Sequence, residues 1–280
     1  MQHILLPTDF SENSWNAITY ALQLYKDQKC IFTLLNIYTP VIYHLEATQT
    51  SSAQFALQDA MSEVSTIGLD NLQKRIDKKF NNPNHTFSHI SAFNTLTNEI
   101  NELYKDKVID IIIMGTQGAS GIKEILFGSN TMHIINHAKC PVLAIPNNFD
   151  FETPHGILFP SDYNIAFQEK HVQHTLDIAN QFHARINILH VLHGNKLSEK
   201  QELNRRKLEA YFKKATLLFH TIENKNIPEA ITEFQLKARI NLLVMLNNKH
   251  SFFENLFFKS NIKHIGFHLN IPFLVIPSRT

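Results

Sequence analysis

Short apolar runs alternate along the chain with longer stretches in which apolar residues recur at helical spacing. In the first half, the runs predict strands at 2–7, 30–38, 85–92, 108–114 and 141–145. The stretches between them predict helices at 12–26, 53–80, 94–106 and 129–138. One of them, ITYALQLY, places Ile18, Ala21, Leu22 and Tyr25 on a single helical stripe. Near-continuous runs such as VIDIIIM suit parallel strands that are covered on both faces, so the alternation predicts a doubly wound α/β sheet.

The same order of segments occurs twice. HILLPTDFS near the start returns as GILFPSDYN at 156–164, FTLLNIY at 32–38 as INILHVL at 186–192, and KCPVLAIP at 139–146 as NIPFLVIP at 270–277. Three matches in the same order indicate a tandem duplication. We therefore expect one domain at 1–147, a polar linker at 148–154 and a second domain at 155–280.

The second copy predicts strands at 156–160, 186–192, 218–222, 240–246 and 272–276. It is shorter than the first, and we attribute this mainly to the missing counterpart of TPVIYHLEATQTSS at 39–52. We expect an irregular surface loop there, and a lid over a ligand is the alternative.

Composition narrows the function classes. The 280 residues are 44% hydrophobic and 18% charged, which is ample for folded domains. A net charge of +1 argues against a nucleic-acid binder that relies on a broad basic face. Cys30 and Cys140 form no CxxC motif and are expected to be reduced, buried thiols. No secretory signal or apolar run of membrane-spanning length is visible, so we expect a soluble, cytoplasmic protein that binds no membrane.

The stretch MGTQGASGIKEILFGSN, at 114–130, follows a predicted strand and leads into a predicted helix. In open α/β sheets, ligands bind beyond the carboxyl ends of the strands. A phosphate there needs inward-facing backbone N–H groups, little side-chain bulk and a helix N-terminus aimed at the charge. Gly115 and Gly118 could allow close backbone approach, and Gly128, Ser129 and Asn130 could start the helix. The stretch is neither a Walker A loop nor GxGxxG.

The spacing Gly115-x2-Gly118-x9-Gly128-Ser129 resembles the ATP-binding signature of the universal stress protein family. PTDFS and HAKCPVLAIP resemble that family too, so the resemblance covers nearly the whole chain as a tandem, UspA-like form. It implies two open five-stranded parallel α/β sheets with helices on both faces, of the adenine nucleotide alpha hydrolase-like type. It also implies ATP (or AMP or ADP) binding, dimerisation through the last strand and a role in the stress response. Carried over, the nucleotide contacts are Asp9, the backbone at Asn36 and Ile37, Gly115, Gly118, Gly128, Ser129 and Asn130.

The second half provides an internal comparison, since its counterpart MLNNKHSFFENLFFKSN replaces the glycines with Leu246, Lys249 and Lys259. Bulky side chains there would block backbone approach, so we expect one nucleotide site, in the first half. The alternative is that glycine serves a positive φ in the first loop only. Ser260 survives in the second loop, so Ser129 alone is ambiguous.

Other candidate residues have simpler explanations. Asp9, like Asp162, is placed to cap a helix, and we expect capping combined with an adenosine contact. His133 with His137, and His264 with His268, are spaced to share a metal, but no third ligand is evident, so no protein-held metal is expected. Mg²⁺ could accompany ATP. The phenylalanines of SFFENLFFKS, at 251–260, are expected in the core or an interface.

No nucleophile–base set is visible in the sequence, so enzyme activity is not expected beyond slow ATP hydrolysis. The expected function is regulatory: bound nucleotide alters a surface for an unknown protein partner. Edge pairing of PVLAIP with PFLVIP would form an intramolecular pseudo-dimer, with a homo-oligomer as the alternative. The rival functions are a nucleotide-free interaction scaffold and a slow nucleotide-dependent hydrolase or transferase.

Overall fold

The structure is a computed structural model that describes residues 1–38, 51–116, 128–192, 194, 196–223, 226–248 and 270–278, with side chains in the helix that begins at Ser51 described from Phe55. It divides into two compact units, Met1–Phe151 and Glu152–Thr280. The division falls inside the segment 148–154 that the sequence analysis treats as a linker.

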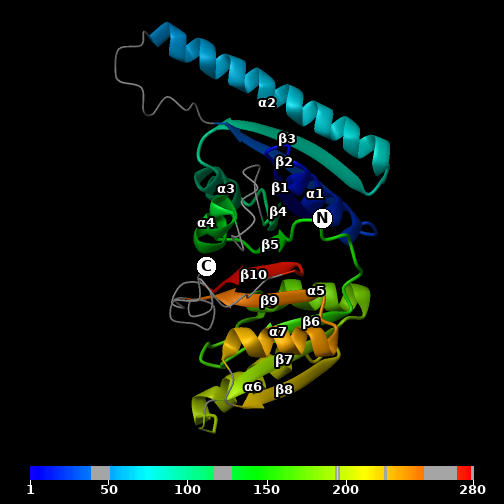
Figure 1. The fold of residues 1–280 in the computed structure, drawn as a ribbon, viewed down its shortest axis with the longest axis vertical. Helices are drawn as coiled ribbons and strands as arrows, with labels where there is room; N and C mark the ends of the chain where they lie inside the picture. Colours follow the sequence, from blue (N-terminus) through cyan, green and yellow to red (C-terminus); the bar gives the residue numbers. More distant parts are fainter. Residues whose placement is uncertain are drawn as a thin grey trace. The chain divides into compact units, whose positions relative to one another are not determined.

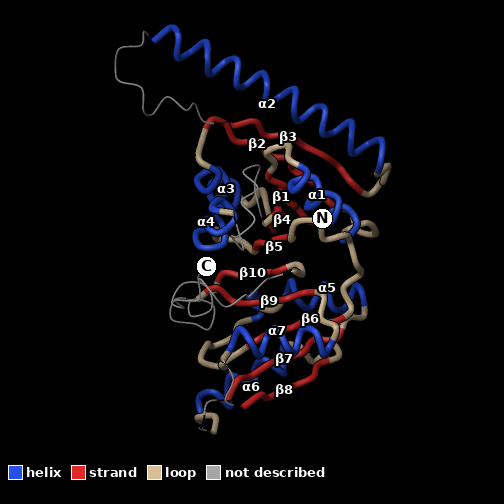
Figure 2. Tube along the Cα trace, viewed as in Figure 1, coloured by secondary structure: helices blue, strands red, loops and turns tan. Residues whose placement is uncertain are grey.

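The first unit is a five-stranded parallel sheet with the order β3-β2-β1-β4-β5 (Figures 1 and 2). Its strands are β1 (Gln2–Pro7), β2 (Cys30–Tyr38), β3 (His85–Phe93), β4 (Ile111–Gly115) and β5 (Val142–Ile145). The chain adds strands in one direction from β1 to β3 and then returns to add β4 on the other side of β1. This reversal is the topological switch point of a doubly wound sheet.

Four helices cover this sheet: α1 (Glu12–Leu24), α2 (Ser51–Lys79), α3 (Leu96–Lys105) and α4 (Ser129–His137). The helices α1 and α2 lie on one face of the sheet, while α3 and α4 lie on the opposite face and contact each other (Figure 1). The predicted stripe on α1 is confirmed, because Ile18, Ala21, Leu22 and Tyr25 are all at most 4% exposed. Burial of that stripe against the sheet, rather than helix propensity, holds the helix in place.

The start of β4 differs from the sequence prediction. The predicted strand 108–114 begins only at Ile111. Lys107 has a φ of 57°, and the backbone N–H of Val108 donates to the carbonyl of Leu103. The chain is therefore still completing the end of α3 at these positions, which delays the strand.

The second unit repeats the architecture with the sheet order β10-β9-β6-β7-β8, again parallel throughout. Its strands are β6 (Gly156–Pro160), β7 (Arg185–Leu192), β8 (Leu217–Glu223), β9 (Leu242–Asn247) and β10 (Phe273–Pro277). Its helices are the 3-10 turn η2 (Glu169–His171), α5 (Gln173–Phe182), α6 (Glu199–Tyr211) and α7 (Ile227–Ala238). All five predicted strands of this half are confirmed within a residue or two of their predicted ends.

The two units differ most in the helix that follows their second strand. The first unit has α2, which is 29 residues long, whereas its counterpart α6 is 13 residues long. The shorter second half is therefore not explained mainly by the loss of 39–52, as the sequence analysis holds, because helix length contributes at least as much. Residues 51 and 52 of that stretch belong to α2, and 39–50 lie outside the described residues. In the described ranges, no helix is long and apolar enough to cross a membrane.

Candidate functional site

The carboxyl ends of β1, β2 and β4 lie next to one another at the switch point of the first sheet. Ile4 and Leu5 of β1 pair with Ile111 and Ile112 of β4, and β1 pairs along its whole length with β2. Because all three strands run parallel, the residues that follow Pro7 and Gly115, and the last residues of β2, share one edge. This edge therefore brings together Asp9, Asn36, Ile37 and Gly115.

Asp9 is exposed and shapes the turn between β1 and α1. Its Oδ1 accepts hydrogen bonds from the backbone N–H of Ser11, at 3.1 Å, and from the Ser11 hydroxyl. The cap of α1 is Ser11 itself, whose hydroxyl accepts from the backbone N–H of Ser14 at 3.2 Å. The expectation that Asp9 caps the helix directly is therefore wrong. Asp9 holds the residue that does so, in an Asx turn.

Asn36 ties the end of β2 to the start of this turn. The side chain is 8% exposed, and its Nδ2 donates to the Thr8 carbonyl at 2.7 Å. This bond lies next to the last backbone contact of the β1–β2 ladder, from Thr8 N–H to the Leu35 carbonyl. Ile37 continues the strand opposite Ala92 of β3. The amide of Asn36 thus fixes the backbone that carries Asp9.

The second unit builds the same turn with different residues. Asp162 accepts from the backbone N–H of Asn164 at 3.0 Å, as Asp9 does from Ser11. His190, at the position that matches Asn36, has its Nδ1 2.9 Å from the Ser161 carbonyl. Asp162 and His190 thus make the equivalent contacts in the second unit, whose loop lacks the matching glycines. The structural roles of Asp9 and Asn36 therefore do not depend on a ligand.

The residue after this aspartate distinguishes the two units. Phe10 and Tyr163 both adopt a left-handed backbone, with φ of 62° and 57°. Tyr163 is 2% exposed, whereas Phe10 is 38% exposed. From α6, Asn204 Nδ2 donates to the Tyr163 carbonyl at 2.8 Å and Gln201 Nε2 to the Asp162 carbonyl at 2.8 Å. Hydrogen bonds from α6 thus fix the turn of the second unit and bury Tyr163, whereas Phe10 in the first unit stays partly exposed.

The ends of the glycine-containing loop meet in the first unit. Thr116, which is 4% exposed, continues the β4–β5 ladder by donating its N–H to the Ile145 carbonyl at 2.9 Å. The N–H of Gly128 donates to the carbonyl of the same Thr116. Thr131 of α4 donates its hydroxyl to the Gly115 carbonyl at 2.8 Å. These bonds fasten the start of α4 to the end of β4.

The N-terminus of α4 has no side-chain cap. In α1, α3, α6 and α7 the capping side chains of Ser11, Thr95, Ser198 and Asn226 each accept a backbone hydrogen bond, whereas α5, which follows the turn η2, also begins without a side-chain cap. In α4 the cap position is Gly128, no side-chain cap bond forms, and the first turn has no acidic residue. Ser129 and Asn130 of this turn are exposed. First-turn N–H groups have no intrahelical partners, so this helix end presents donors and a positive dipole end to an anion.

Backbone conformation does not explain the described glycines of this site. Gly128 has φ of −59° and ψ of 153°, which any L-residue can adopt. Among the described glycines, only Gly194 has a positive φ, so Gly115 does not need one either. The alternative that the first loop keeps glycine for a positive φ is therefore wrong at Gly115 and Gly128. Gly118 lies outside the described residues, as do Lys249, Lys259 and Ser260 of the second loop.

The described part of the chain contains no group of three or more His, Cys, Asp or Glu that could hold a metal ion. His133 and His137 lie one turn apart on α4 with ring centroids 4.2 Å apart, and His137 Nδ1 is 2.8 Å from the His133 carbonyl. His264, His268 and the segment 251–260 lie outside the described residues.

Sequence reasoning missed three threonines that organise the site: Thr8, Thr116 and Thr131. Thr8 directly follows the predicted strand 2–7, and Thr116 follows the predicted strand 108–114 after Gly115, so a hydroxyl residue close behind an apolar run is the signal that could have found them. The signal for Thr131 is weaker, since its bond to Gly115 depends on how α4 returns to the sheet.

Comparison with known proteins identifies the family of the first unit. The sequence profile of the universal stress protein family matches residues 1–146. The universal stress protein MJ0577 of Methanocaldococcus jannaschii is 27% identical over 156 residues, which cover 51% of this chain and 93% of the relative. MJ0531 of the same organism is 27% identical over 144 residues, covering 51% and 80% of the two chains.

A solved structure matches the whole chain. The crystal structure of a universal stress protein from Archaeoglobus fulgidus superposes with a TM-score of 0.72, and the match covers 98% of both chains at 19% identity. This match extends the likeness in fold to the second unit. With a family profile that spans more than half of its residues, the chain belongs to the universal stress protein family.

Proposed function

We propose that this protein is a regulatory, adenine-nucleotide-binding member of its family, with one ATP site in the first unit. The observation that carries the proposal is the start of α4, which lacks a side-chain cap and an acidic residue and has a glycine that its backbone does not require. A phosphate could take the place of the missing cap and accept from the first-turn N–H groups. Ser129 and Asn130 would add donors from their exposed side chains.

The adenosine would lie at the neighbouring strand ends, beside Asp9 and the backbone of Asn36 and Ile37. Gly115 would leave room for the ligand between these ends and α4, and Gly118 is the further contact that the family signature implies. The residues present thus fit a nucleotide, with Mg²⁺ bound through its phosphates rather than by a protein cluster. In the second unit, Gln201 and Asn204 hold the matching turn against α6, which supports a single site.

Isothermal titration calorimetry of the full chain with ATP tests the proposal. The expected result is one ATP per chain. Gly128→Leu should abolish binding because its side chain fills the space beside the helix end, whereas Gly128→Ala should fold normally, since φ is −59°. Gly128→Lys introduces the residue that the second half has at this place. Comparison of its ATP affinity with that of Gly128→Leu separates the effect of a positive charge from that of added bulk. Two sites per chain, or unchanged affinity in Gly128→Leu, would refute the one-site proposal.

The remaining elements of the proposed function are a cytoplasmic location, a role in the stress response and assembly as an intramolecular pseudo-dimer or a homo-oligomer. The segments PVLAIP, at 141–146, and PFLVIP, at 272–277, stay the predicted elements for a pseudo-dimer. ATP turnover above background in the titrated sample would favour the slow-hydrolase alternative. Absence of both binding and turnover would favour the nucleotide-free scaffold.

A further inference from the structure

The long helix α2 of the first unit is only half covered. Among the side chains described from Phe55 onward, the first buried one is Ser65, and from there Leu69, Leu72 and Ile76 pack on the sheet. Between residues 55 and 64 no side chain is buried. Figure 1 shows this end of α2 reaching past the ends of β2 and β3. Packing on the sheet therefore does not stabilise the first turns of the helix. An isolated helix as short as these turns is marginal in water, so another contact is needed to hold them.

The uncovered part of α2 carries an apolar stripe. Leu57, Ala60, Val64 and Ile67 follow one another at spacings that place them on one face of a helix, and all four are exposed. Val64 is 68% exposed and Ile67 51%. In the second unit the counterpart α6 has a single large exposed apolar residue, Leu203. An exposed stripe of this kind on a soluble protein indicates an interface.

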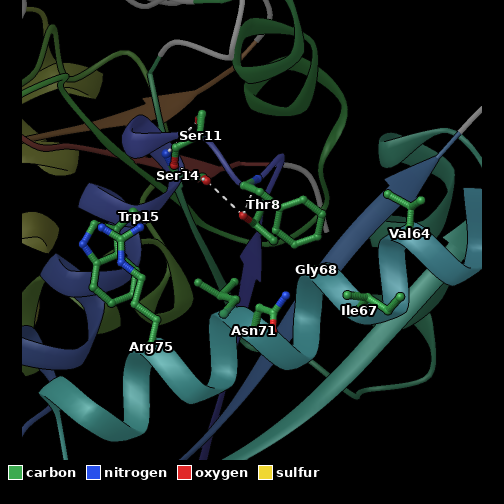
Figure 3. Close-up of a pocket in the computed structure, with 11 residues that line it drawn as sticks. Thr8, Ser11, Ser14, Trp15, Val64, Ile67, Gly68, Asn71 and Arg75 are labelled. Atoms are coloured by element: carbon green, nitrogen blue, oxygen red, sulfur yellow. Dashed lines mark hydrogen bonds between the residues drawn. The ribbon is translucent and has the colours of Figure 1, made fainter.

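The stripe forms one wall of a groove. Val64, Ile67 and Gly68 of α2 line an open cavity of about 440 Å³ together with Phe10 and Trp15 (Figure 3). The hydroxyls of Thr8 and Ser14 at its edge already bond to each other, at 2.9 Å. Arg75 lies with its guanidinium 3.8 Å from the Trp15 ring centroid and bonds to both carboxylate oxygens of Glu12. The hydroxyls and the guanidinium are thus engaged within the unit, and apart from Asn71 the rest of the lining is mainly apolar.

The charges of α2 are segregated along its length. Residues 51–73 contain Asp59, Glu63 and Asp70 and no lysine or arginine, while 74–79 contain Lys74, Arg75, Lys78 and Lys79 against Asp77. A parallel pair of such helices would set like charges together, whereas an antiparallel pair sets opposite charges together. This asymmetry also disfavours an anionic membrane as the occupant, because the apolar half has no basic residues.

We infer that α2 is the interface at which two copies of this chain associate, with the two helices antiparallel. Asp59 and Glu63 are four residues apart, and so are Lys74 and Lys78, so one antiparallel register pairs Glu63 with Lys74 and Asp59 with Lys78 of the second copy. Glu63 and Lys74 lie on the same side of the apolar stripe at Val64. In an antiparallel helix pair with two-fold symmetry, this side of one helix faces the same side of the other, so Glu63 can meet Lys74.

In this register Ile67 of each copy lies opposite Asp70 of the other, less than one turn from Gly68 and from the Phe10 ring that packs on it, and Val64 lies opposite Gln73. The apolar contacts supply most of the affinity, because exposed ion pairs contribute little each. The ion pairs fix the register and direction. This surface is separate from the edge strands through which the sequence resemblance implies family dimerisation.

Sedimentation velocity of the full chain without added nucleotide, over concentrations from about 1 to 100 µM, tests the inference. The expected result is a monomer–dimer equilibrium that Val64→Glu with Ile67→Glu weakens about tenfold or more. Leu236→Glu is the matched control, because Leu236 on α7 is 70% exposed and lies outside the proposed surface. It should leave the equilibrium unchanged. Far-ultraviolet circular dichroism confirms that the variants keep their fold.

Charge reversal tests the register. Glu63→Lys and Lys74→Glu should each weaken the dimer, and the two together should restore it. A chain that stays monomeric at every concentration would overturn the inference, as would a dimer that ignores Val64→Glu with Ile67→Glu, or a double reversal without rescue. Binding of a monomeric chain to phosphatidylserine vesicles, lost in the Val64 and Ile67 variant, would assign the surface to membranes instead.

Discussion

Gly68 is an unusual residue to find inside α2, and Phe10 explains it. A Cβ at Gly68 would lie 2.5, 2.7 and 3.0 Å from three carbon atoms of the Phe10 ring. Glycine in a helix interior costs about 1 kcal/mol of stability relative to alanine. The structure therefore predicts that Gly68→Ala improves the helix and displaces the ring at the same time.

The two effects can be weighed. Full burial of a phenylalanine side chain stabilises by about 1.5–3 kcal/mol. Phe10 is already 38% exposed, so a displaced ring loses only part of this, about 1–2 kcal/mol. Against a helix gain of about 1 kcal/mol, Gly68→Ala should be neutral to destabilising by about 1 kcal/mol in the native background. In Phe10→Ala it should stabilise by about 1 kcal/mol, which gives a coupling energy of about 1–2 kcal/mol.

Urea unfolding monitored by tryptophan fluorescence measures this cycle. Trp15 is the single tryptophan of the chain and reports the first unit. The protein is held near 1 µM, where an interface of modest affinity is dissociated. Ala60→Gly on the exposed face of α2 is the control, and should cost at most about 1 kcal/mol, the same amount whether or not Phe10 is present. A coupling energy below about 0.5 kcal/mol between Gly68 and Phe10 would refute the reasoning.

Three further predictions concern groups inside the two units. Burial lowers the pKa of His85 and His171 below its usual 6.5, so the unfolded chain takes up protons first; the free energy of unfolding should be constant above about pH 6.5 and fall below it, as urea titrations at several pH values would show. Burial raises the pKa of the Cys30 thiol to about 11 and that of Cys140 to about 12, so Ellman's reagent should label neither until urea unfolds the chain; rapid labelling of the native protein would contradict their burial. Asn36→Ala leaves the Thr8 carbonyl without its side-chain donor and should cost about 1–3 kcal/mol in unfolding free energy, whereas Asn36→His, which copies the second unit, should cost less.

The sheet was predictable because its strands are buried on both faces. Such strands leave near-continuous apolar runs in the sequence, and the runs at 2–7 and 30–38 coincide with β1 and β2. The ends of elements were less predictable. The start of β4 depends on how α3 ends at Lys107, which is a matter of local backbone conformation that apolar spacing does not encode.

The candidate site was predictable as a set of strand and helix ends, since parallel strands bring their carboxyl ends to one edge. The roles of single residues were not. Asp9 bonds Ser11 rather than capping α1, and Asn36 acts through its side chain on Thr8. The contact of Phe10 with Gly68 joins positions far apart in the chain, and no periodicity predicts it.

The hydrogen bond from Gly128 to Thr116 joins the two ends of the connection between β4 and α4, so the sequence between them can change without separating the strand from the helix. The two ends of the connection are joined to each other and, through Thr131 and Ile145, to the sheet. Closure of the connection is therefore secured by the framework rather than by the residues in between. A duplicated gene can then change the inserted sequence in one copy while the strand and helix keep their connection. Exchange of 117–127 for another segment should therefore leave the junction of Thr116 with Gly128 and of Gly115 with Thr131 in place.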